Sequence, residues 1–402
     1  MNIIRLQRRP DWISRSRGSG GMKYRADAIV IGLGGMGSSA AYQLSTRGAS
    51  VIGFDQFDPA HSRGSSHGES RIIRQAYCEH PGYVPLLMRA YDLWRNLQRD
   101  SGEEGLLRIT GGLYFGTRDS ATVSGSLQSA LQYNLPHQVL NSDELRHRFP
   151  VFQTRTDEVA VWEQNAGFVR PERAIRACLQ QANQRGAELR FNESISTWEV
   201  TTAGTVQVTT GKGVYESDRL ILTPGAWAPE MLSDLHVPLV VQRHVMAWFD
   251  PIGSTGPFMP NHFPIYLWEN TPRSIFYGFP AIDGPSGGAK IAMHTGGEVC
   301  TPQSIDRNIR SDDVKELREQ MEERVPALNG PLLTASTCMY TMTPDQHFVV
   351  GLHPTHQQVA IACGFSGHGF KFAPVIGEVL ADLVLAGKTA HPIGFLSPYR
   401  FR

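Results

Sequence analysis

A glycine-rich turn between two apolar segments constrains the fold of this chain more than any other feature. Residues 27–31 (D-A-I-V-I) have the β-branched, apolar character of a strand buried on both faces. Residues 32–37 then read G-L-G-G-M-G, small residues continue toward Gly48, and a second apolar segment at 51–54 precedes Asp55. The order strand, G-x-G-x-x-G turn, helix, strand and acidic residue predicts a Rossmann-type dinucleotide-binding fold.

Each position of this motif has a predicted physical role. Gly32 permits a tight turn, Gly34 lets a pyrophosphate approach the backbone, and Gly37 lets the helix pack closely on the strand. The helix N-terminus offers unpaired N–H groups and the positive end of its dipole to the phosphates. Asp55 is expected to accept hydrogen bonds from the adenosine ribose. The motif does not distinguish NAD from FAD, and a glycine-rich turn in another kind of α/β protein is the alternative.

Length, charge and cysteine content narrow the class of protein. The 402 residues are enough for two domains. The 38 basic and 38 acidic residues balance, which argues against nucleic acid or a membrane surface as a partner, and no apolar run is long enough to cross a bilayer. Five cysteines are scattered without a C-x-x-C pair, so we expect a reducing compartment, the cytoplasm.

Residues 1–21 differ from the rest of the chain. They carry five arginines and one aspartate, and no apolar segment follows Arg8 and Arg9. This arrangement is not that of a secretory signal. We expect a disordered extension, with Met22 as an alternative start.

Two later regions complete the predicted architecture. Residues 238–295 are rich in aromatic residues and proline, and they predict strands at 240–249, 263–268, 274–279 and 289–294. Near the C-terminus, a predicted strand at 359–363 runs into G-F-S-G-H-G-F-K at 364–371 and then a helix. A helix N-terminus at that point would stabilise negative charge at the N1–C2 edge of a reduced isoalloxazine. An ordinary glycine-rich connection is the alternative.

Six separated motifs occur together in this chain. They are residues 32–37, S-H-G-E-S-R-I-I-R at 66–74, Y-G-F-P at 277–280, Lys290 with His294, C-M-Y-T at 338–341, and residues 364–371. With them, the sequence from about Tyr24 to its C-terminus resembles the monomeric sarcosine oxidase and N-methyltryptophan oxidase family, flavoproteins that oxidise secondary amino acids. The resemblance implies an α/β fold in which a Rossmann-type FAD-binding domain is interleaved with an α+β substrate domain built on a mostly antiparallel sheet.

The resemblance also implies domain boundaries. The FAD-binding domain is expected to comprise residues 22–85, 155–232 and 325–402. The substrate domain is expected to comprise residues 86–154 and 233–324.

The cofactor implied by the resemblance is FAD, covalently attached through a cysteine. Cys338 matches that position, and His67 and Arg71 match residues near the flavin. Gly364, Gly367 and Lys371 of the second glycine-rich motif are also expected to bind the cofactor. A nearby cation would help a thiolate to attack the flavin. From the residue pattern alone, Cys338 would be a buried small hydrophobe on a strand. Ser66 stands where the family often has the first histidine of His-His-Gly, and this substitution is expected to alter flavin attachment.

The resemblance assigns catalytic and substrate-binding roles as well. Lys290 matches a lysine that activates oxygen electrostatically, while Arg74 and Lys371 match a pair that grips the substrate carboxylate. His294, Tyr277 and Tyr340 match residues that border the substrate. The segment Tyr266-Leu267-Trp268 differs from the sarcosine enzymes, and Trp268 is expected to reshape the pocket. From the residue pattern alone, Lys290 would be a surface lysine, His294 a structural histidine, and Tyr277 and Tyr340 packed aromatic residues.

The expected activity is FAD-dependent oxidation of an N-methyl or cyclic amino acid to an imine by a monomer, with O2 reduced to H2O2 and without a metal. Other substrates within this class, pipecolate, proline or a fructosyl amino acid, remain open. So do a flavin dehydrogenase with another acceptor, an NAD-dependent dehydrogenase, and a non-catalytic flavin-binding protein.

Overall fold

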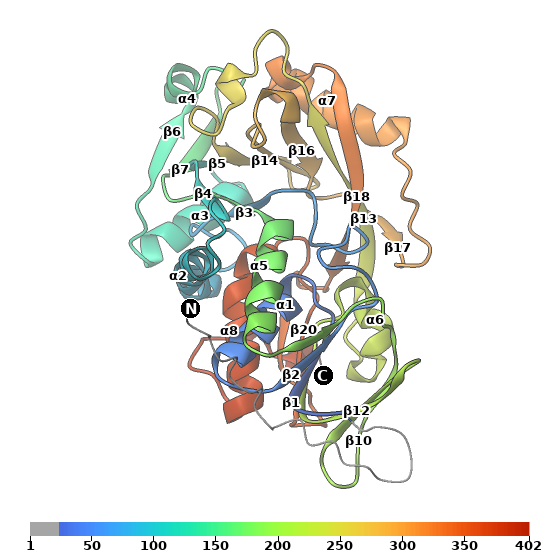
Figure 1. Ribbon diagram of the computed structural model, residues 1–402. Helices are drawn as coiled ribbons and strands as arrows, with labels where there is room; N and C mark the ends of the chain where they lie inside the picture. The colour runs from blue at the N-terminus through green and yellow to red at the C-terminus, as the bar shows by residue number, and fades with distance from the viewer. Residues whose placement is uncertain (1–23, 402) are drawn as a thin grey trace, which may run out of the picture.

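The computed structural model describes residues 24–401, so the expected N-terminal extension lies outside the described residues. Two β-sheets organise the chain: an eight-stranded sheet in the lower part of Figure 1 and a nine-stranded sheet in the upper part. The chain passes between them several times, and a small three-stranded sheet formed by β3, β8 and β4 lies near their junction. Within residues 24–401, no helix is both long and apolar enough to cross a membrane.

The eight-stranded sheet contains the predicted nucleotide-binding unit. Strands β1, β2, β12 and β20 run parallel, with Ala28 beside Val51 and Leu220 beside Val359. Consequently the carboxyl ends of β1, β12 and β20 lie at one edge, where α/β sheets bind their ligands. The strands are β1 (Tyr24–Ile31), β2 (Val51–Phe54), β9 (Glu188–Arg190), β10 (Ile195–Val200), β11 (Val206–Thr210), β12 (Gly213–Leu222), β19 (Val349–Leu352) and β20 (Val359–Cys363).

Helices α1 (Gly35–Thr46), α5 (Pro171–Gln184) and α8 (Ala373–Ala386) pack beside this sheet, with α1 in contact with both of the others. A Cβ atom at Gly377 would lie 2.6 Å from the backbone carbon of Ser39, so α8 and α1 approach this closely only because that position is glycine. The short helix α6 (Ala228–Met231) follows β12. This packing holds the N-termini of α1 and α8 near the carboxyl edge of the sheet.

The nine-stranded sheet is antiparallel except where β14 pairs with β5. Leu317 and Met321 of α7 (Ser311–Arg324) pack with the aromatic core on one of its faces. The shorter helices α3 (Ala121–Gln132) and α4 (Ser142–Arg148) lie toward the β5–β7–β6 side. The strands are β5 (Gly112–Thr117), β6 (Gln138–Asn141), β7 (Glu158–Glu163), β13 (Val240–Phe249), β14 (Ile265–Thr271), β15 (Ser274–Phe279), β16 (Ala289–Met293), β17 (Glu298–Cys300) and β18 (Leu332–Met342).

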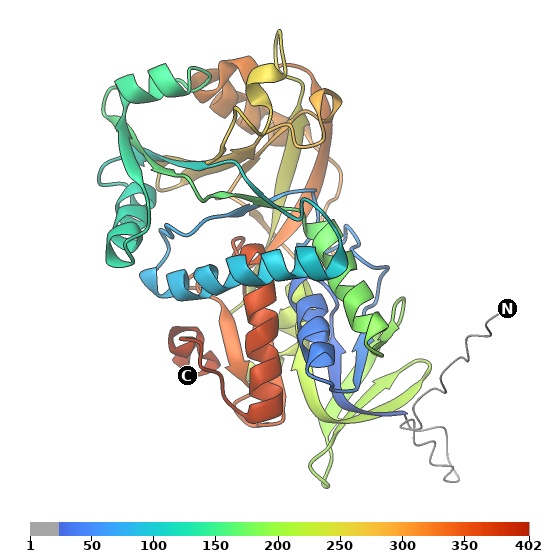
Figure 2. The ribbon, with the colours of Figure 1, turned by 60° about the vertical axis from the view of Figure 1, so that its left-hand side comes forward.

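The sheets divide the chain differently from the expected boundaries at three elements. Helix α2 (Val84–Ser101) was expected in the substrate domain, but it packs against α5 and α8 and crosses between the two parts in Figure 2. Strands β7 and β18 were expected in the FAD-binding domain, but they pair within the nine-stranded sheet. The strand patterns were recognisable locally, whereas the partner of each strand depends on contacts far away in the sequence.

The three-stranded sheet links both parts. Its strands are β3 (Arg71–Ile73), β4 (Leu107–Ile109) and β8 (Gly167–Val169), with β8 in the centre. Because β3 ends directly before Arg74, this sheet sets where that side chain enters the interior.

Candidate active site

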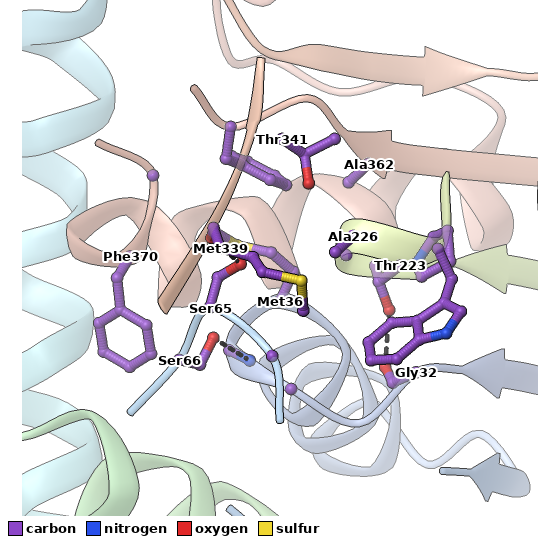
Figure 3. Close-up of a pocket in the computed structure, with 18 of the residues that line it drawn as sticks. Gly32, Met36, Ser65, Ser66, Thr223, Ala226, Met339, Thr341, Ala362 and Phe370 are labelled. Atoms are coloured by element: carbon purple, nitrogen blue, oxygen red, sulfur yellow. Dashed lines mark hydrogen bonds between the residues drawn. The ribbon is translucent and has the colours of Figure 1, made fainter. Parts of the chain in front are cut away.

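The glycine turn after β1 is built as its sequence predicts. Gly32 has φ +85°, and a Cβ atom at Gly37 would lie 1.8 Å from the oxygen of Gly32, so neither position accommodates a side chain without movement of the backbone. At Gly34, an added Cβ would meet only the Ser66 hydroxyl, at 3.8 Å. Figure 3 shows this turn with Ser66 and Thr223 beside it. The space over Gly34 is therefore open to a ligand.

Asp55 lines the cavity above this turn and is itself buried. Its carboxylate accepts hydrogen bonds from the backbone N–H groups of Leu33, at 2.8 Å, and Phe57, at 3.0 Å. Thr223 also stabilises the glycine turn, because its hydroxyl donates a hydrogen bond to the backbone oxygen of Gly32 at 2.7 Å. Asp55 thus fixes the turn, while its remaining acceptor capacity stays available to a ribose.

A cavity of about 740 Å³ extends from this turn to the second glycine-rich motif. Its lining includes Gly32, Gly34, Gly364 and Gly367. A Cβ atom at Gly367, where φ is +78°, would lie 2.4 Å from the ring of Tyr340, so the backbone passes directly against that ring. The motif leads into a 3₁₀ turn (Phe370–Phe372), of which Phe370 and Lys371 line the cavity, and then into α8. The predicted cofactor glycines of both motifs therefore meet at one cavity, except Gly37, which packs beneath it.

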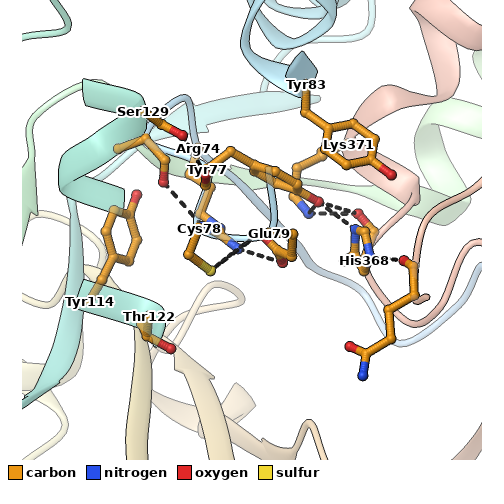
Figure 4. Close-up of polar contacts among 12 residues, drawn as sticks. Arg74, Tyr77, Cys78, Glu79, Tyr83, Tyr114, Thr122, Ser129, His368 and Lys371 are labelled. Atoms are coloured by element: carbon orange, nitrogen blue, oxygen red, sulfur yellow. Dashed lines mark hydrogen bonds and ion pairs between the residues drawn. The ribbon is translucent and has the colours of Figure 1, made fainter. Parts of the chain in front are cut away.

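Two buried cations, Arg74 and Lys371, also line the cavity. Arg74 is buried, and its Nη2 lies 2.8 and 2.7 Å from the two carboxylate oxygens of Glu79 (Figure 4). Burial alone would lower the pKa of Arg74, but Cys78 and Glu79 outweigh it and keep the guanidinium charged. Burial would likewise raise the pKa of Glu79, yet Arg74 holds that pKa well below its ordinary value. Glu79 also lines the cavity, so Arg74 already binds one carboxylate there.

Lys371 is the second of these cations. Its Nζ donates to the backbone oxygen of His368 at 2.7 Å and lies 3.4 Å from the hydroxyl of Tyr77. Burial and the charge of Arg74 lower the pKa of Lys371 to about 7, with Glu79 opposing them. The ammonium therefore titrates near neutral pH, and a bound anion would favour its charged form.

Aromatic side chains from two strands and from the turn after a third border the same space. The hydroxyls of Tyr277 and Tyr340 are 3.2 Å apart, and His294 lines the cavity beside both rings. Strand β16 ends at Met293, one residue before the predicted strand end, so His294 begins the following turn. Burial lowers the pKa of His294 to about 4, which keeps its imidazole neutral at physiological pH.

Lys290 is fully buried rather than on the surface and does not line the cavity. Its Nζ donates to the backbone oxygens of Gly68 at 2.8 Å and Ser70 at 2.7 Å. The ring centroid of Phe279, which does line the cavity, lies 4.1 Å from the same Nζ. Burial and the charge of Arg71 lower the pKa of Lys290 well below its ordinary value.

Cys338 and His67 are both buried beside Arg71 and outside the cavity lining. Burial raises the pKa of the Cys338 thiol, while Arg71 and Lys290 act in the opposite direction. Burial and Arg71 lower the pKa of His67 to about 3, and its Nε2 has no hydrogen-bond partner within the described residues. Arg71 itself lines the cavity and donates to the backbone oxygen of Ser65 at 3.0 Å. An unpartnered buried nitrogen beside this cavity is consistent with a missing polar ligand.

The expectation for Trp268 is corrected. Its indole belongs to the other core, stacked on Phe115 with ring centroids 4.0 Å apart, and it does not line the cavity. Its neighbour Leu267 lines the cavity instead. Successive residues of a strand point to opposite faces, and Leu267 stands directly across from Tyr277. The pairing with Tyr277 is the signal that would have selected Leu267.

Three other residues of the site had not been singled out. Glu79 and Tyr77 follow Arg74 closely, and His368 lies within the second glycine-rich motif. Proximity to Arg74 was the available signal, but sequence spacing does not show that a loop folds back onto a cation. These residues become part of the site only through tertiary packing.

The residues present fit FAD. The open space over Gly34 and a single cavity joining both glycine-rich motifs suit a flavin dinucleotide, and the unpartnered Nε2 of His67 is a buried polar atom beside that cavity. A family model described as FAD dependent oxidoreductase matches residues 27–383. The chain belongs to this family of FAD-dependent oxidoreductases.

Two relatives define the branch of this family to which the chain belongs. Over 375 residues, the chain is 52% identical to monomeric sarcosine oxidase of Streptomyces avermitilis, covering 93% of this chain and 97% of the relative. Over 378 residues, it is 34% identical to N-methyl-L-tryptophan oxidase of Yersinia pestis, covering 94% of this chain and 99% of the relative. Within the flavoprotein family, the chain therefore belongs with the monomeric sarcosine and N-methyl-L-tryptophan oxidases.

Solved structures share the fold. NikD, an amino acid oxidase essential for nikkomycin biosynthesis, matches with a TM-score of 0.79 at 22% identity, over 93% of this chain and 97% of its own. The L-proline dehydrogenase of P. horikoshii matches with a TM-score of 0.80 at 23% identity, over 94% and 98%. The predicted fold class, an FAD-binding α/β unit with a mostly antiparallel second sheet, is confirmed.

Proposed function

We propose that this chain oxidises a secondary amino acid, N-methylated or cyclic, to an imine, using FAD and transferring the electrons to O2 to form H2O2. Water then hydrolyses the imine, and an oxidised N-methyl group leaves as an aldehyde. The observation that carries the proposal is that one cavity is lined both by the dinucleotide turn and by two buried cations, Arg74 and Lys371. A carboxylate is the anion that such a pair binds well.

Bound FAD supplies the two-electron acceptor that no amino-acid side chain can provide. The turn at Gly32–Gly37 and the N-terminus of α1 would hold its pyrophosphate, and Asp55 would contact its ribose. At the other end, the N-terminal region of α8 would face the flavin ring. The proposed carboxylate site, Arg74 and Lys371, therefore lies on the flavin-ring side of the cavity, away from the pyrophosphate.

Substrate orientation follows from the residues around the two cations. Arg74 and Lys371 would bind the carboxylate, which fixes one end of the amino acid, and the rings of Tyr277 and Tyr340 would border its other end. Only an unprotonated amine has the lone pair that forms the C=N bond. The neutral imidazole of His294 adds no positive charge beside that amine. We therefore expect flavin reduction to accelerate with pH through the pKa of the bound amine.

Lys290 is proposed to favour the reaction with O2. The two backbone oxygens that it contacts hold its Nζ at a fixed position behind Phe279, and Glu172 and Glu69 favour its charged form against burial and Arg71. A fixed cation stabilises the negative charge that oxygen acquires as it accepts an electron.

Covalent attachment of FAD through Cys338 is also proposed. Arg71, and after it Lys290, favour the thiolate, since burial alone raises the pKa of that thiol. The test is acid precipitation of the purified protein: the yellow colour should stay with the polypeptide, be released in Cys338→Ser and stay in Cys300→Ser. Colour released from the wild type would show that the flavin is not tethered.

The substrate is tested with an anaerobic panel of N-alkyl and cyclic amino acids, in which loss of the yellow colour reports flavin reduction. We expect bleaching by amino acids with a secondary amine and not by their primary-amine counterparts. In air, one H2O2 per turnover would support O2 as the acceptor, whereas bleaching without peroxide would support a dehydrogenase. Failure of every amine to bleach the flavin would overturn the proposal. The relatives described as monomeric also lead us to propose a monomer, which light scattering would test.

A further inference from the structure

A chain of hydrogen bonds joins Lys371 to a loop at the surface (Figure 4). From Nζ of Lys371 to the hydroxyl of Tyr77 the distance is 3.4 Å, and from that hydroxyl to Nδ1 of His368 it is 2.5 Å. On the other side of the imidazole, Nε2 lies 2.9 Å from the backbone oxygen of Gln346, an exposed residue. The three linked side chains, those of Lys371, Tyr77 and His368, are all buried.

The last contact fixes the direction of the whole chain. A backbone oxygen can only accept, so Nε2 of His368 carries the proton and Nδ1 of the neutral ring is an acceptor. Burial lowers the pKa of His368 to about 3, which keeps the ring neutral. Tyr77 therefore donates its hydroxyl proton to Nδ1, since the backbone oxygen of His368 is farther away, at 3.4 Å. The oxygen of Tyr77 then presents a lone pair to Lys371.

Tyr77 is itself held in place. Its backbone oxygen accepts a hydrogen bond from Ser129 at 2.6 Å, and its ring packs edge-on against Phe372. The guanidinium of Arg74 lies 4.4 Å from the centroid of the same ring, and Nζ of Lys371 lies 5.0 Å from it. One tyrosine thus contacts both cations of the site.

We propose that Tyr77 and His368 are positioning residues that orient the Lys371 ammonium toward the substrate carboxylate, an inference that rests on the proposed carboxylate-binding role of Lys371. The Tyr77 oxygen and the His368 backbone oxygen occupy two of the three N–H groups of the ammonium. The third N–H remains for the ligand. Because the His368 tautomer is fixed, the Tyr77 proton does not turn toward Lys371 and repel it.

The pH dependence of anion binding follows from the groups that face Lys371. Burial and Arg74 lower the pKa of Lys371 to about 7, whereas Glu79 and Cys78 raise it. The titratable and charged groups around it come from several elements: Arg74, Tyr77, Cys78, Glu79, His294 and His368. Carboxylate affinity should therefore fall as pH rises above about 7. Removing the Tyr77 oxygen disfavours the charged lysine, so that fall should begin at a lower pH.

The test is calorimetric titration of the holoenzyme with acetate, from about pH 6 to about pH 9. In Tyr77→Phe, we expect acetate affinity near neutral pH to fall about tenfold, as for loss of a hydrogen bond to a charged group, with the pH transition displaced downward. Tyr83→Phe is the matched control, because that neighbouring hydroxyl contacts His347 and the backbone of Phe348 instead of Lys371. It should bind acetate as the wild type does.

A second pair of variants tests the role of His368 independently, in case Tyr77→Phe does not fold. His368→Leu removes the acceptor for Tyr77 and should weaken acetate binding, whereas His368→Gln can keep both a donor and an acceptor and should restore it. Equal affinity and equal pH profiles in Tyr77→Phe and Tyr83→Phe, or in the two His368 variants, would overturn this inference alone. If wild-type enzyme fails to bind acetate, the carboxylate site itself is wrong, and the inference fails with it.

Discussion

Arg74 and Glu79 form an ion pair inside the cavity, with both carboxylate oxygens of Glu79 within 2.8 Å of one guanidinium nitrogen. The side chain of Arg74 is almost fully buried, and that of Glu79 is 18% exposed. Glu79 therefore occupies the cation that the proposed substrate needs. It also borders a smaller hollow of about 410 Å³ with His80, Gln128 and Tyr133, so the same residue contributes to both cavities.

Replacing this internal carboxylate should favour substrate binding at the expense of stability. In Glu79→Gln, we expect a lower KM for the amino acid at pH well below 7, where Lys371 stays charged without Glu79, because Arg74 no longer contacts a competing anion. Loss of a hydrogen-bonded charge should reduce the free energy of unfolding by ~1–3 kcal/mol. Steady-state kinetics and urea unfolding measure the two effects, and an increased KM would contradict competition.

The difference in stability between the wild type and Glu79→Gln should become smaller as pH falls. Arg74 holds the pKa of Glu79 well below its ordinary value despite burial, so the stabilisation is present above the unfolded pKa of about 4.3 and is lost as pH falls. Wild type and Glu79→Gln should therefore converge in Tm under acidic conditions. A difference that grows on acidification would exclude this pair as its source.

The two glycines of the nucleotide turn should respond differently to the same added methyl group. In Gly37→Ala, the Cβ would lie 1.8 Å from the Gly32 oxygen, so we expect loss of soluble, folded protein. In Gly34→Ala, the nearest atom is 3.8 Å away, and we expect a folded protein with reduced flavin content, because the methyl enters the proposed pyrophosphate space. Circular dichroism and the flavin-to-protein absorbance ratio separate these outcomes. Full flavin content in Gly34→Ala would argue against that placement.

Removing the charge of Lys290 should affect oxygen more than substrate. In Lys290→Met, we expect reoxidation of the reduced flavin by O2 to slow by about 10²–10³, as for loss of one preorganised electrostatic contact. Anaerobic reduction should change much less, because Lys290 does not line the cavity. Stopped-flow measurement of each half-reaction provides the test, with exposed Lys388→Met as a control. Equal slowing of both half-reactions would indicate a structural role alone.

Adjacent residues of β14 should separate specificity from stability. Leu267→Ala enlarges the cavity, so we expect relative kcat/KM to shift toward amino acids with larger side chains. Trp268→Phe loses part of the packing on Phe115 and should lower stability by ~1–3 kcal/mol without changing substrate preference. Competition between two amino acids of different size measures the preference. A shift in preference with Trp268→Phe and none with Leu267→Ala would contradict the assigned faces of the strand.

Much of the nucleotide-binding unit could be predicted because its signals are local. The turn from Gly32 to Gly37, both flanking strands and the glycine-rich segment before α8 lie where the residue pattern put them. The four strands predicted at 240–294 in the second sheet were also recognisable, within three residues at their ends. The sheet to which each strand belongs could not be predicted, because β7 and β18 pair with strands that are distant in sequence.

The sequence by itself determined that the chain has a dinucleotide turn, a second glycine-rich helix entry and the cationic residues Arg74, Lys290 and Lys371. Only the tertiary structure decided which side chains face the cavity: Leu267 does and Trp268 does not, and Glu79 folds back onto Arg74. The physical reason is that backbone geometry in a turn is set by the residues within it. The direction of a side chain in a strand or loop is set by the packing of distant segments around it.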